Sequence, residues 1–214
     1  MPKLKLFPEV STSILSKVIT GTEQCLWSAW FRARHNHTQR PDDFDFRTWS
    51  FEHADLVRKE ADRLESEGWT VTVESQNSYS IRGSVATLKG KPDIVAVRGS
   101  SGLILDAKTG KPKDFHSVQV LLYMWSIPRY FKKFSDIKFD GQVSYKINHM
   151  PVYNDQLSDG FVSIFSDMIR LLSGDEPPVK RPSETECKYC KITDEDCDER
   201  ILLAPALVVE TEEF

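Results

Sequence analysis

The spacing of hydrophobic and polar positions predicts a chain in which helices alternate with strands. In residues 50–67 apolar side chains recur every three or four positions, which is typical of an amphipathic helix, and Gly68 follows as a helix end. Residues 114–127 are expected to form another helix, with Asp114 as its N-cap and Pro128 as its stop. The same pattern predicts helices over residues 11–34, with a break beside Gly21, and over residues 157–172.

Shorter runs with β-branched residues predict the strands. They lie at residues 69–74, 79–88, 94–97, 103–105 and 143–147. Residues 98–102 (Arg-Gly-Ser-Ser-Gly) are rich in hairpin residues and join the third strand to the fourth. This order of elements predicts an α/β fold with a mixed central β-sheet flanked by helices.

Composition is that of a globular protein with an uneven charge distribution. The 214 residues are 40% hydrophobic and 28% charged, and no apolar run is long enough to span a membrane. The net charge is −4, but residues 194–214 contain eight acids and one base, so residues 1–193 carry a net +3. Because local patches matter more than the total, nucleic-acid binding is compatible with this charge. Each basic patch could also be ordinary solvated surface. The patches lie at Arg32, Arg34, His35, His37 and Arg40; at Lys108, Lys111 and Lys113; and at Arg129, Lys132 and Lys133.

Two short motifs point to divalent-metal chemistry. Asp93 follows Lys91-Pro92, and thirteen residues later Asp106 is followed by Ala107 and Lys108. Side chains alternate along a strand, so Asp106 and Lys108 project to one side, and a hairpin can bring Asp93 beside them. Carboxylates are ligands for Mg²⁺ or Mn²⁺, so Asp93, Asp106 and the Ala107 carbonyl are candidate ligands. Lys108 is a candidate for activating water or stabilising charge. The alternative is that the acids are turn residues and Lys108 is a solvated charge.

These motifs resemble the PD-(D/E)XK nuclease superfamily. Pro92-Asp93 matches the first half of its signature and Asp106-Ala107-Lys108 the second, with Asp in place of the commoner Glu. Gln119 and Tyr123 follow four residues apart on one helix face, as in the RecB-like branch. The resemblance implies a restriction-endonuclease-like core, with Gln119 and Tyr123 at the active site and the DNA. It also implies that His53 reaches the metal, although the glycine that usually precedes this histidine is missing; Glu60 is a reserve candidate.

Four cysteines indicate a second, softer metal site. Cys187, Cys190 and Cys197 lie within eleven residues, whereas Cys25 is near the other end of the chain. Four thiolates can hold a zinc ion or an iron–sulfur cluster, and the spacing is not that of a zinc ribbon. One distant cysteine plus a C-terminal trio resembles the iron–sulfur nucleases of the RecB-like group, including the CRISPR-associated Cas-four exonuclease family. The resemblance implies a structural 4Fe-4S cluster that joins the N- and C-terminal segments; zinc and unliganded thiols stay open.

The sequence thus predicts a metal-dependent DNA nuclease that acts as an exonuclease on single-stranded DNA or frayed ends. The expected division is an N-terminal arm (1–49), a nuclease core (50–175), a cluster segment (176–202) and a flexible acidic tail (203–214). The resemblance connects it to CRISPR spacer acquisition or DNA repair. Trp27, Trp30, Phe31 and Tyr189 are candidates for stacking on bases, although most of them are expected to belong to the core.

No signal-peptide pattern opens the chain, so we expect a cytoplasmic protein with no membrane partner. Proteins of CRISPR adaptation or repair are candidate partners, and a homo-oligomer stays open. One rival hypothesis is a catalytically silent DNA-binding or assembly subunit with the same fold and cluster. The others are a hydrolase of another phosphate ester and an interaction module that a structural zinc ion holds together.

Overall fold

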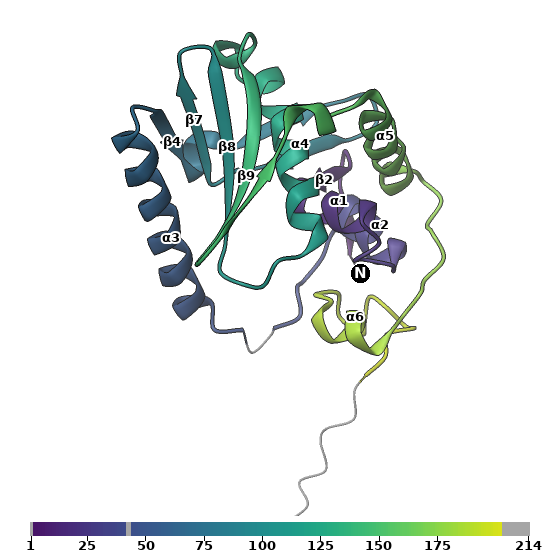
Figure 1. The fold of residues 1–214 in the computed structure, drawn as a ribbon. Coiled ribbons are helices and arrows are strands. Elements are labelled where there is room, and N and C mark those ends of the chain that lie inside the picture. The colour runs from purple at the N-terminus through teal and green to yellow at the C-terminus, as the bar shows by residue number, and fades with distance from the viewer. Residues whose placement is uncertain (1, 42–43, 203–214) are drawn as a thin grey trace, which may run out of the picture.

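A five-stranded mixed sheet forms the centre of the protein (Figure 1). The computed structural model describes residues 2–41 and 44–202. The strand order is β10 (His149–Val152), β9 (Lys138–Tyr145), β8 (Ser101–Lys108), β7 (Ile94–Arg98) and β4 (Thr70–Val73). The β8–β9 pair is parallel and the other neighbouring pairs are antiparallel. The predicted mixed α/β plan is confirmed in this sheet.

Helices cover both faces of the sheet. Helix α3 (Phe46–Ser66) lies on one face and α4 (Asp114–Tyr130) on the other (Figure 1). Alternation along β8 sorts its side chains between them, because Leu105 and Ala107 pack in the cluster under α3 whereas Ile104 packs in the cluster under α4. By the same alternation, Asp106 and Lys108 project to the α4 face.

The N-terminal region packs into the α4-side core. It contributes α1 (Thr12–Ile19), α2 (Leu26–Arg34) and β2 (Glu9–Ser11), which joins β6 (Thr87–Gly90) and β5 (Tyr79–Arg82) in a three-stranded sheet. Val10, Leu15 and Ala29 are at most 1% exposed and share one hydrophobic cluster with Leu122 of α4 and Leu172 of α5 (Asp159–Ser173). The segment expected to form an arm, residues 1–49, therefore shares its core with the rest of the chain.

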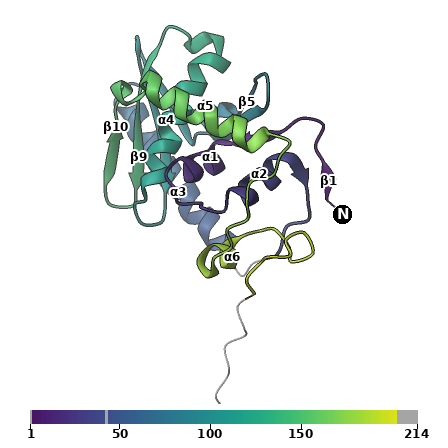
Figure 2. The ribbon, with the colours of Figure 1, turned by 90° about the vertical axis from the view of Figure 1, so that its right-hand side faces the viewer.

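The cysteine-rich segment returns to the N-terminal helices. Helix α6 (Glu184–Tyr189) lies below α2 in both ribbon views (Figure 2). The Glu186 carboxylate accepts hydrogen bonds from the backbone N–H groups of Gln24 (2.5 Å) and Cys25 (3.1 Å). A bridge between Gln39 and Ile192 adds a second contact. The predicted flexible acidic tail, residues 203–214, lies outside the described residues.

Several predicted boundaries differ from the structure. Pro128 lies inside α4, in the last turn, where its fixed φ suits a helix and only one backbone hydrogen bond is lost. The N-cap of α4 is Lys113, and Asp114 lies in the first turn, where an acid still favours the helix dipole. The expected strand over residues 79–88 is two strands, β5 and β6, joined by a turn in which Gly83 N–H donates to the Ala86 carbonyl (2.9 Å).

The remaining elements are short. The predicted break near Gly21 is confirmed, since Gly21 has a φ of +68° between α1 and α2. The other elements are the paired strands β1 (Lys3–Leu4) and β3 (His35–Asn36) and the 3₁₀ turns η1 (Glu74–Asn77), η2 (Lys132–Phe134) and η3 (Asn154–Gln156). Within the described ranges, no helix combines the length and the hydrophobicity that crossing a membrane requires.

Candidate active site

The antiparallel β7–β8 hairpin brings the two predicted acids together. Ile94 pairs with Leu105, so continuing the register by one residue places Asp93 opposite Asp106. Residues directly opposite in an antiparallel pair project to the same face. The N–H of Ala107 donates to Oδ2 of Asp93 (2.7 Å), which fixes the Asp93 carboxylate against β8. In an extended strand the carbonyl of a residue points the same way as its N–H, so the Ala107 carbonyl faces Asp93 as well.

Asp106 is a buried carboxylate whose charge is balanced by Lys108. The residue is 2% exposed, and its Oδ2 forms an ion pair with the Lys108 ammonium. Apart from this ion pair, Oδ2 has no hydrogen-bond partner among the described residues. Burial raises the pKa of Asp106 to about 6, against the lowering effect of Lys108. Burial by itself lowers the pKa of Lys108, but Asp106 and Asp93 outweigh it and raise that pKa. Lys108 is therefore held protonated.

His53 reaches the same site from the first turns of α3. Its Nε2 lies 3.3 Å from Oδ2 of Asp93, and this hydrogen bond raises the pKa of His53. The ring stacks on Trp49, with centroids 5.1 Å apart. Glu60, the reserve candidate, faces elsewhere, since its Oε2 accepts from Arg63 (2.8 Å) and its Oε1 lies 3.6 Å from His149.

Helix α4 closes the site with buried polar residues. Gln119 and Tyr123 are 6% and 3% exposed, and Nε2 of Gln119 donates to the Tyr123 hydroxyl (2.7 Å). Burial raises the pKa of Tyr123 well above its ordinary value, and the Asp106 carboxylate adds to the rise. Tyr123 is thus a neutral phenol close enough to Asp106 to respond to its charge.

The structure adds a polar pair that the sequence did not single out as a unit. Tyr145 pairs with Lys108 in the β8–β9 register, and its hydroxyl lies 2.9 Å from Nδ1 of His116. Burial lowers the pKa of His116 to about 4, and Lys108, Lys113 and Lys17 add to the lowering. The alternation of Val143 and Tyr145 in the predicted strand was the available signal that Tyr145 could face the site. Nothing in the sequence indicated that Lys17 lies near His116.

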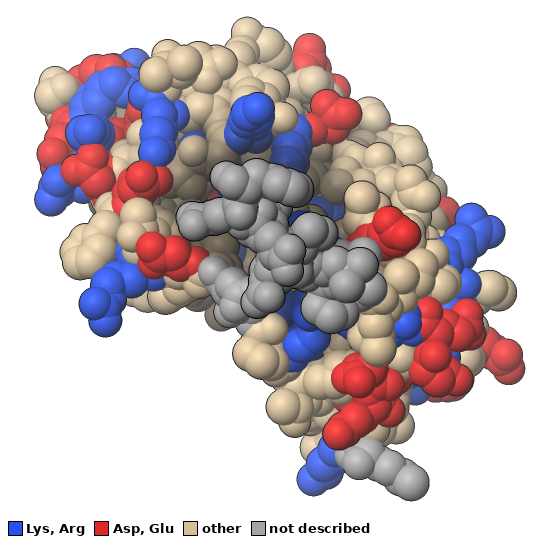
Figure 3. Space-filling model, turned by 90° about the horizontal axis from the view of Figure 1, so that it is seen from below, with Lys and Arg blue, Asp and Glu red and all other residues tan. Residues whose placement is uncertain are grey.

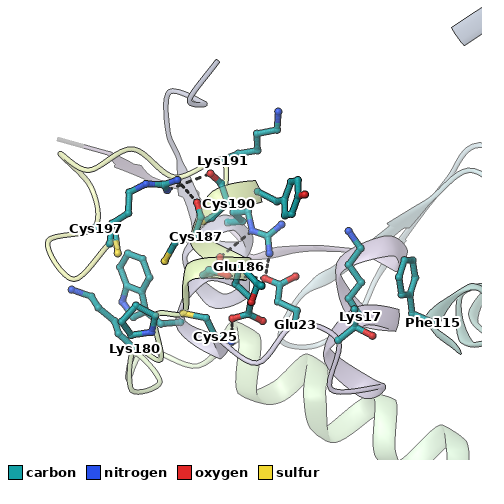
Figure 4. Close-up of a pocket in the computed structure, with 18 of the residues that line it drawn as sticks. Lys17, Glu23, Cys25, Phe115, Lys180, Glu186, Cys187, Cys190, Lys191 and Cys197 are labelled. Carbon is teal, nitrogen blue, oxygen red and sulfur yellow. Dashed lines mark hydrogen bonds and ion pairs between the residues drawn. The ribbon is translucent and has the colours of Figure 1, made fainter. Parts of the chain in front are cut away.

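The four cysteines converge on one cavity of about 460 Å³, which we call the cysteine cavity (Figure 4). All four are free thiols, and Cys187 is 8% exposed. Arg200 donates to the carbonyls of Ile192 (2.6 Å), Cys190 (3.3 Å) and Cys187, which fixes the shape of the cysteine-rich turn. Burial raises the pKa of the Cys197 thiol, and Cys190 and Cys25 contribute to the rise. The segments at opposite ends of the chain therefore present their thiols to one space.

The comparisons with known proteins identify the family. A family model described as the PD-(D/E)XK nuclease superfamily matches residues 6–194, which is most of the chain. The chain belongs to the PD-(D/E)XK nuclease superfamily. No match was found among curated proteins. Among solved structures, the chain is similar to one titled "Crystal structure of SSO0001", with 18% identity, a TM-score of 0.46, and coverage of 93% of this chain and 90% of that chain.

Membership of the PD-(D/E)XK nuclease superfamily indicates a nuclease, which in this superfamily generally depends on a divalent metal such as Mg²⁺ or Mn²⁺ and acts on DNA. The superfamily part of the predicted resemblance is confirmed. The likeness to the RecB-like branch and to the Cas-four family stays a prediction, and so does the iron–sulfur cluster.

The residues present suit the hard divalent cation of the PD-(D/E)XK nucleases. A buried carboxylate oxygen on Asp106 has only a lysine ammonium as its partner, and a second carboxylate lies opposite it. Within the described residues, no three His, Cys, Asp or Glu side chains are grouped so that they could hold a metal ion. The structure brings together two carboxylates, one in an ion pair with Lys108 and the other hydrogen-bonded to His53.

Three of the four aromatic candidates belong to the core, as was expected for most of them. Trp27, Trp30 and Phe31 are at most 8% exposed, so they belong to the core and are not available for stacking on bases. Their positions on the buried face of α2 explain this, and only Tyr189, 75% exposed, is free to stack. Exposed rings instead occur at the start of α3, at Phe44, Phe46 and Phe51. Together with the half-buried Trp49 they form what we call the aromatic rim.

Proposed function

We propose that this protein is a divalent-metal-dependent deoxyribonuclease that hydrolyses phosphodiester bonds at the Asp93–Asp106–Lys108 site. One observation carries the proposal. The β7–β8 register sets the two acids opposite each other, and Lys108 forms an ion pair with Asp106 in a chain of the PD-(D/E)XK superfamily.

Each side chain has a role that follows from its surroundings. Asp93 and Asp106 would hold Mg²⁺ or Mn²⁺, with His53 and the Ala107 carbonyl as further ligands. When bound, the metal polarises the phosphoryl group and lowers the pKa of a bound water. Lys108 is held protonated, so it suits the stabilisation of negative charge on the phosphate better than the removal of a proton. Tyr123, neutral and fixed by Gln119, orients groups at the site through its hydroxyl.

We propose single-stranded DNA, or a frayed end, as the substrate, and digestion from an end as the mode. The aromatic rim supports this assignment because unstacked bases bind to exposed aromatic rings. Phe46 and Phe44 are 66% and 57% exposed, and Trp49 stacks directly on His53 beside Asp93. A duplex offers no free base faces to such rings. Spacer trimming in CRISPR adaptation or DNA repair is the cellular role that we propose for this reaction.

We propose a structural 4Fe-4S cluster held by Cys25, Cys187, Cys190 and Cys197. The four thiols come from segments near opposite ends of the chain and line one cavity, and four thiolates are the ligand set of such a cluster. The spacing of the cysteines in the sequence is not that of a zinc ribbon. When bound, the cluster supplies metal–thiolate bonds that tie α6 to the start of α2.

The decisive experiment is cleavage of end-labelled single-stranded and duplex oligonucleotides in Mn²⁺ and in EDTA. We expect metal-dependent cleavage of the single strand that Lys108→Ala reduces by at least about 100-fold, in line with the loss of an electrostatic catalytic group. Lys138→Ala is the matched control, since Lys138 lies on the strand beside β8 but at the opposite end of the register from Lys108. Binding without cleavage by the wild-type protein would instead identify a silent DNA-binding subunit.

A further inference from the structure

Two lysines near the active site have no acidic partner. The ammonium groups of Lys17 on α1 and Lys113 before α4 lie 5.4 Å and 5.8 Å from the centroid of the same ring, Phe115. Within the described part of the chain, neither ammonium makes an ion pair or a hydrogen bond. Glu23, the acid that acts on Lys17, is already paired with Arg32 and accepts from Ser28 (2.7 Å).

The positive charge at this point is concentrated rather than dispersed. Burial lowers the pKa of Lys17; Glu23 opposes this change, whereas Arg32, Lys113 and Lys108 lower the pKa further. The pKa of His116 falls to about 4 for similar reasons, since Lys108, Lys113 and Lys17 all act on it. The catalytic lysine and the two unpaired lysines therefore form one region of positive potential. An aromatic ring compensates two ammonium groups only in part, so the fold holds like charges together without a counterion from the protein.

The two lysines line an accessible space. Lys17 lies at one end of the cavity and the cysteines lie toward the other, with Glu23 between them (Figure 4). Lys113 lines the same cavity. Other cations of the cavity have partners: Lys180 pairs with Asp198, and Arg200 binds backbone carbonyls. Viewed from below, Lys and Arg side chains lie both near the middle of the face and at its margins (Figure 3).

We propose that Lys17 and Lys113 form a phosphate-binding subsite that holds a backbone phosphate of the DNA strand beyond the one that is cleaved. The inference rests on the proposed function, because that function supplies the strand. A phosphodiester is the ligand that fits two ammonium groups at the edge of a cavity, and Lys108 is near enough for its charge to act on Lys17. The aromatic rim lies on the α3 side of the acids, so bases would be held on one side of the site and this phosphate on the other.

The test measures binding of a fluorescein-labelled oligo(dT) in EDTA, where no cleavage occurs, over a range of salt concentrations. For a single strand, each phosphate contact adds about 0.7 to the slope of log K against log salt. We expect Lys17→Met/Lys113→Met to weaken binding severalfold and to reduce the slope by about 0.7, the contribution of the one phosphate that the two lysines share. Lys17→Arg/Lys113→Arg keeps both charges and should keep the slope, which separates lost charge from altered packing.

Lys133→Met is the matched control. Lys133 also lies over aromatic rings, 4.6 Å from the Phe134 centroid, but it follows the C-terminal end of α4 whereas Lys113 precedes the N-terminal end. Its variant should bind as the wild type does. Oligonucleotides with and without a 5′-phosphate distinguish a terminal phosphate from an internal one as the ligand.

The failure of this inference and that of the proposed function give different results. Wild-type affinity and slope in a folded Lys17→Met/Lys113→Met protein would overturn the phosphate subsite, even if the wild type cleaves DNA in Mn²⁺. Absence of cleavage by the wild type, with salt-dependent binding that the double variant weakens, would overturn the nuclease but leave the subsite standing.

Discussion

At the residue scale, the site depends on carboxylates that the fold holds away from water. Asp106 is almost fully buried, yet it keeps one oxygen with only a lysine as its partner. Burying a charge without full compensation is unfavourable, and this is accepted at sites that must bind a cation. The motif around Asp93 and Asp106 was sufficient to predict which residues would meet, because strand alternation and a hairpin determine it. The residues Tyr145 and Lys17 come from β9 and α1, so only the folded chain brings them near Lys108.

The raised pKa of Asp106 leads to a prediction about pH. A cation binds the charged carboxylate, so the rise in melting temperature caused by Mn²⁺ should be full above about pH 7 and should fall as the pH drops through about 6. In EDTA, without a bound cation, raising the pH has the opposite effect on the contribution of Asp106 to stability. Its folded-state pKa is above the unfolded value of about 3.9, so its stabilising contribution is present at acid pH and is lost as the pH rises through about 6.

Thermal denaturation at several pH values with Mn²⁺ or EDTA checks this prediction, and Asp106→Asn is the control. The variant has no carboxylate to titrate at this position, so its response to Mn²⁺ should be small at every pH. An equal Mn²⁺ shift at pH 5 and pH 8 in the wild type would contradict the assignment of Asp106 as a ligand.

At the element scale, the packing of α4 on the sheet positions the catalytic side chains. Val120 and Met124 of α4, each next to a predicted site residue, lie over Gly141 of β9. The apolar pattern predicted this helix and its buried face, but it predicted that the helix stops at Pro128. A sequence pattern does not show how the last turn packs, and in the structure Ile127 of that turn is fully buried. The strand β10 was missed because Pro151 lies within it; as an edge strand it tolerates proline.

Gly141→Ala tests this packing. The added methyl group would overlap Cγ1 of Val120 and lie 2.8 Å from Sδ of Met124, so α4 must move away from β9. We expect a loss of about 1–3 kcal/mol of stability, as in other overpacked cores. We also expect a lower kcat, because Gln119 and Tyr123 flank the displaced residues. Gly110→Ala is the control, since nothing lies within 4 Å of a methyl group there. Urea denaturation and cleavage rates give both values, and an unchanged Gly141→Ala protein would show that α4 tolerates displacement.

At the scale of the whole molecule, the chain closes on itself. Residues near Cys25 and the segment that contains α6 meet through Glu186 and line one cavity, although they are about 160 residues apart in sequence. The cysteine pattern predicted this meeting, since four thiols suggested one site. It did not indicate that α1 and α2 pack into the nuclease core, because a helix that buries its face gives no sequence signal of what covers it. The cysteine-rich segment has few buried apolar residues of its own, Cys187 and Ile192 among them.

Cys190→Ala is therefore expected to act on the C-terminal segment before it acts on catalysis. The segment is held by a few polar contacts, whereas the acids lie on the central sheet, so loss of a thiolate ligand should release residues 176–202 and leave β7 and β8 in place. The variant should lose the brown colour expected of an iron–sulfur protein, become less soluble, and be cut by trypsin in this segment while the core persists. Glu186→Gln, which keeps all four thiols but weakens the contact with Gln24 and Cys25, should keep its colour and show intermediate protease sensitivity. A colourless wild type, or a Cys190→Ala protein with wild-type stability and protease resistance, would contradict a structural cluster at these cysteines.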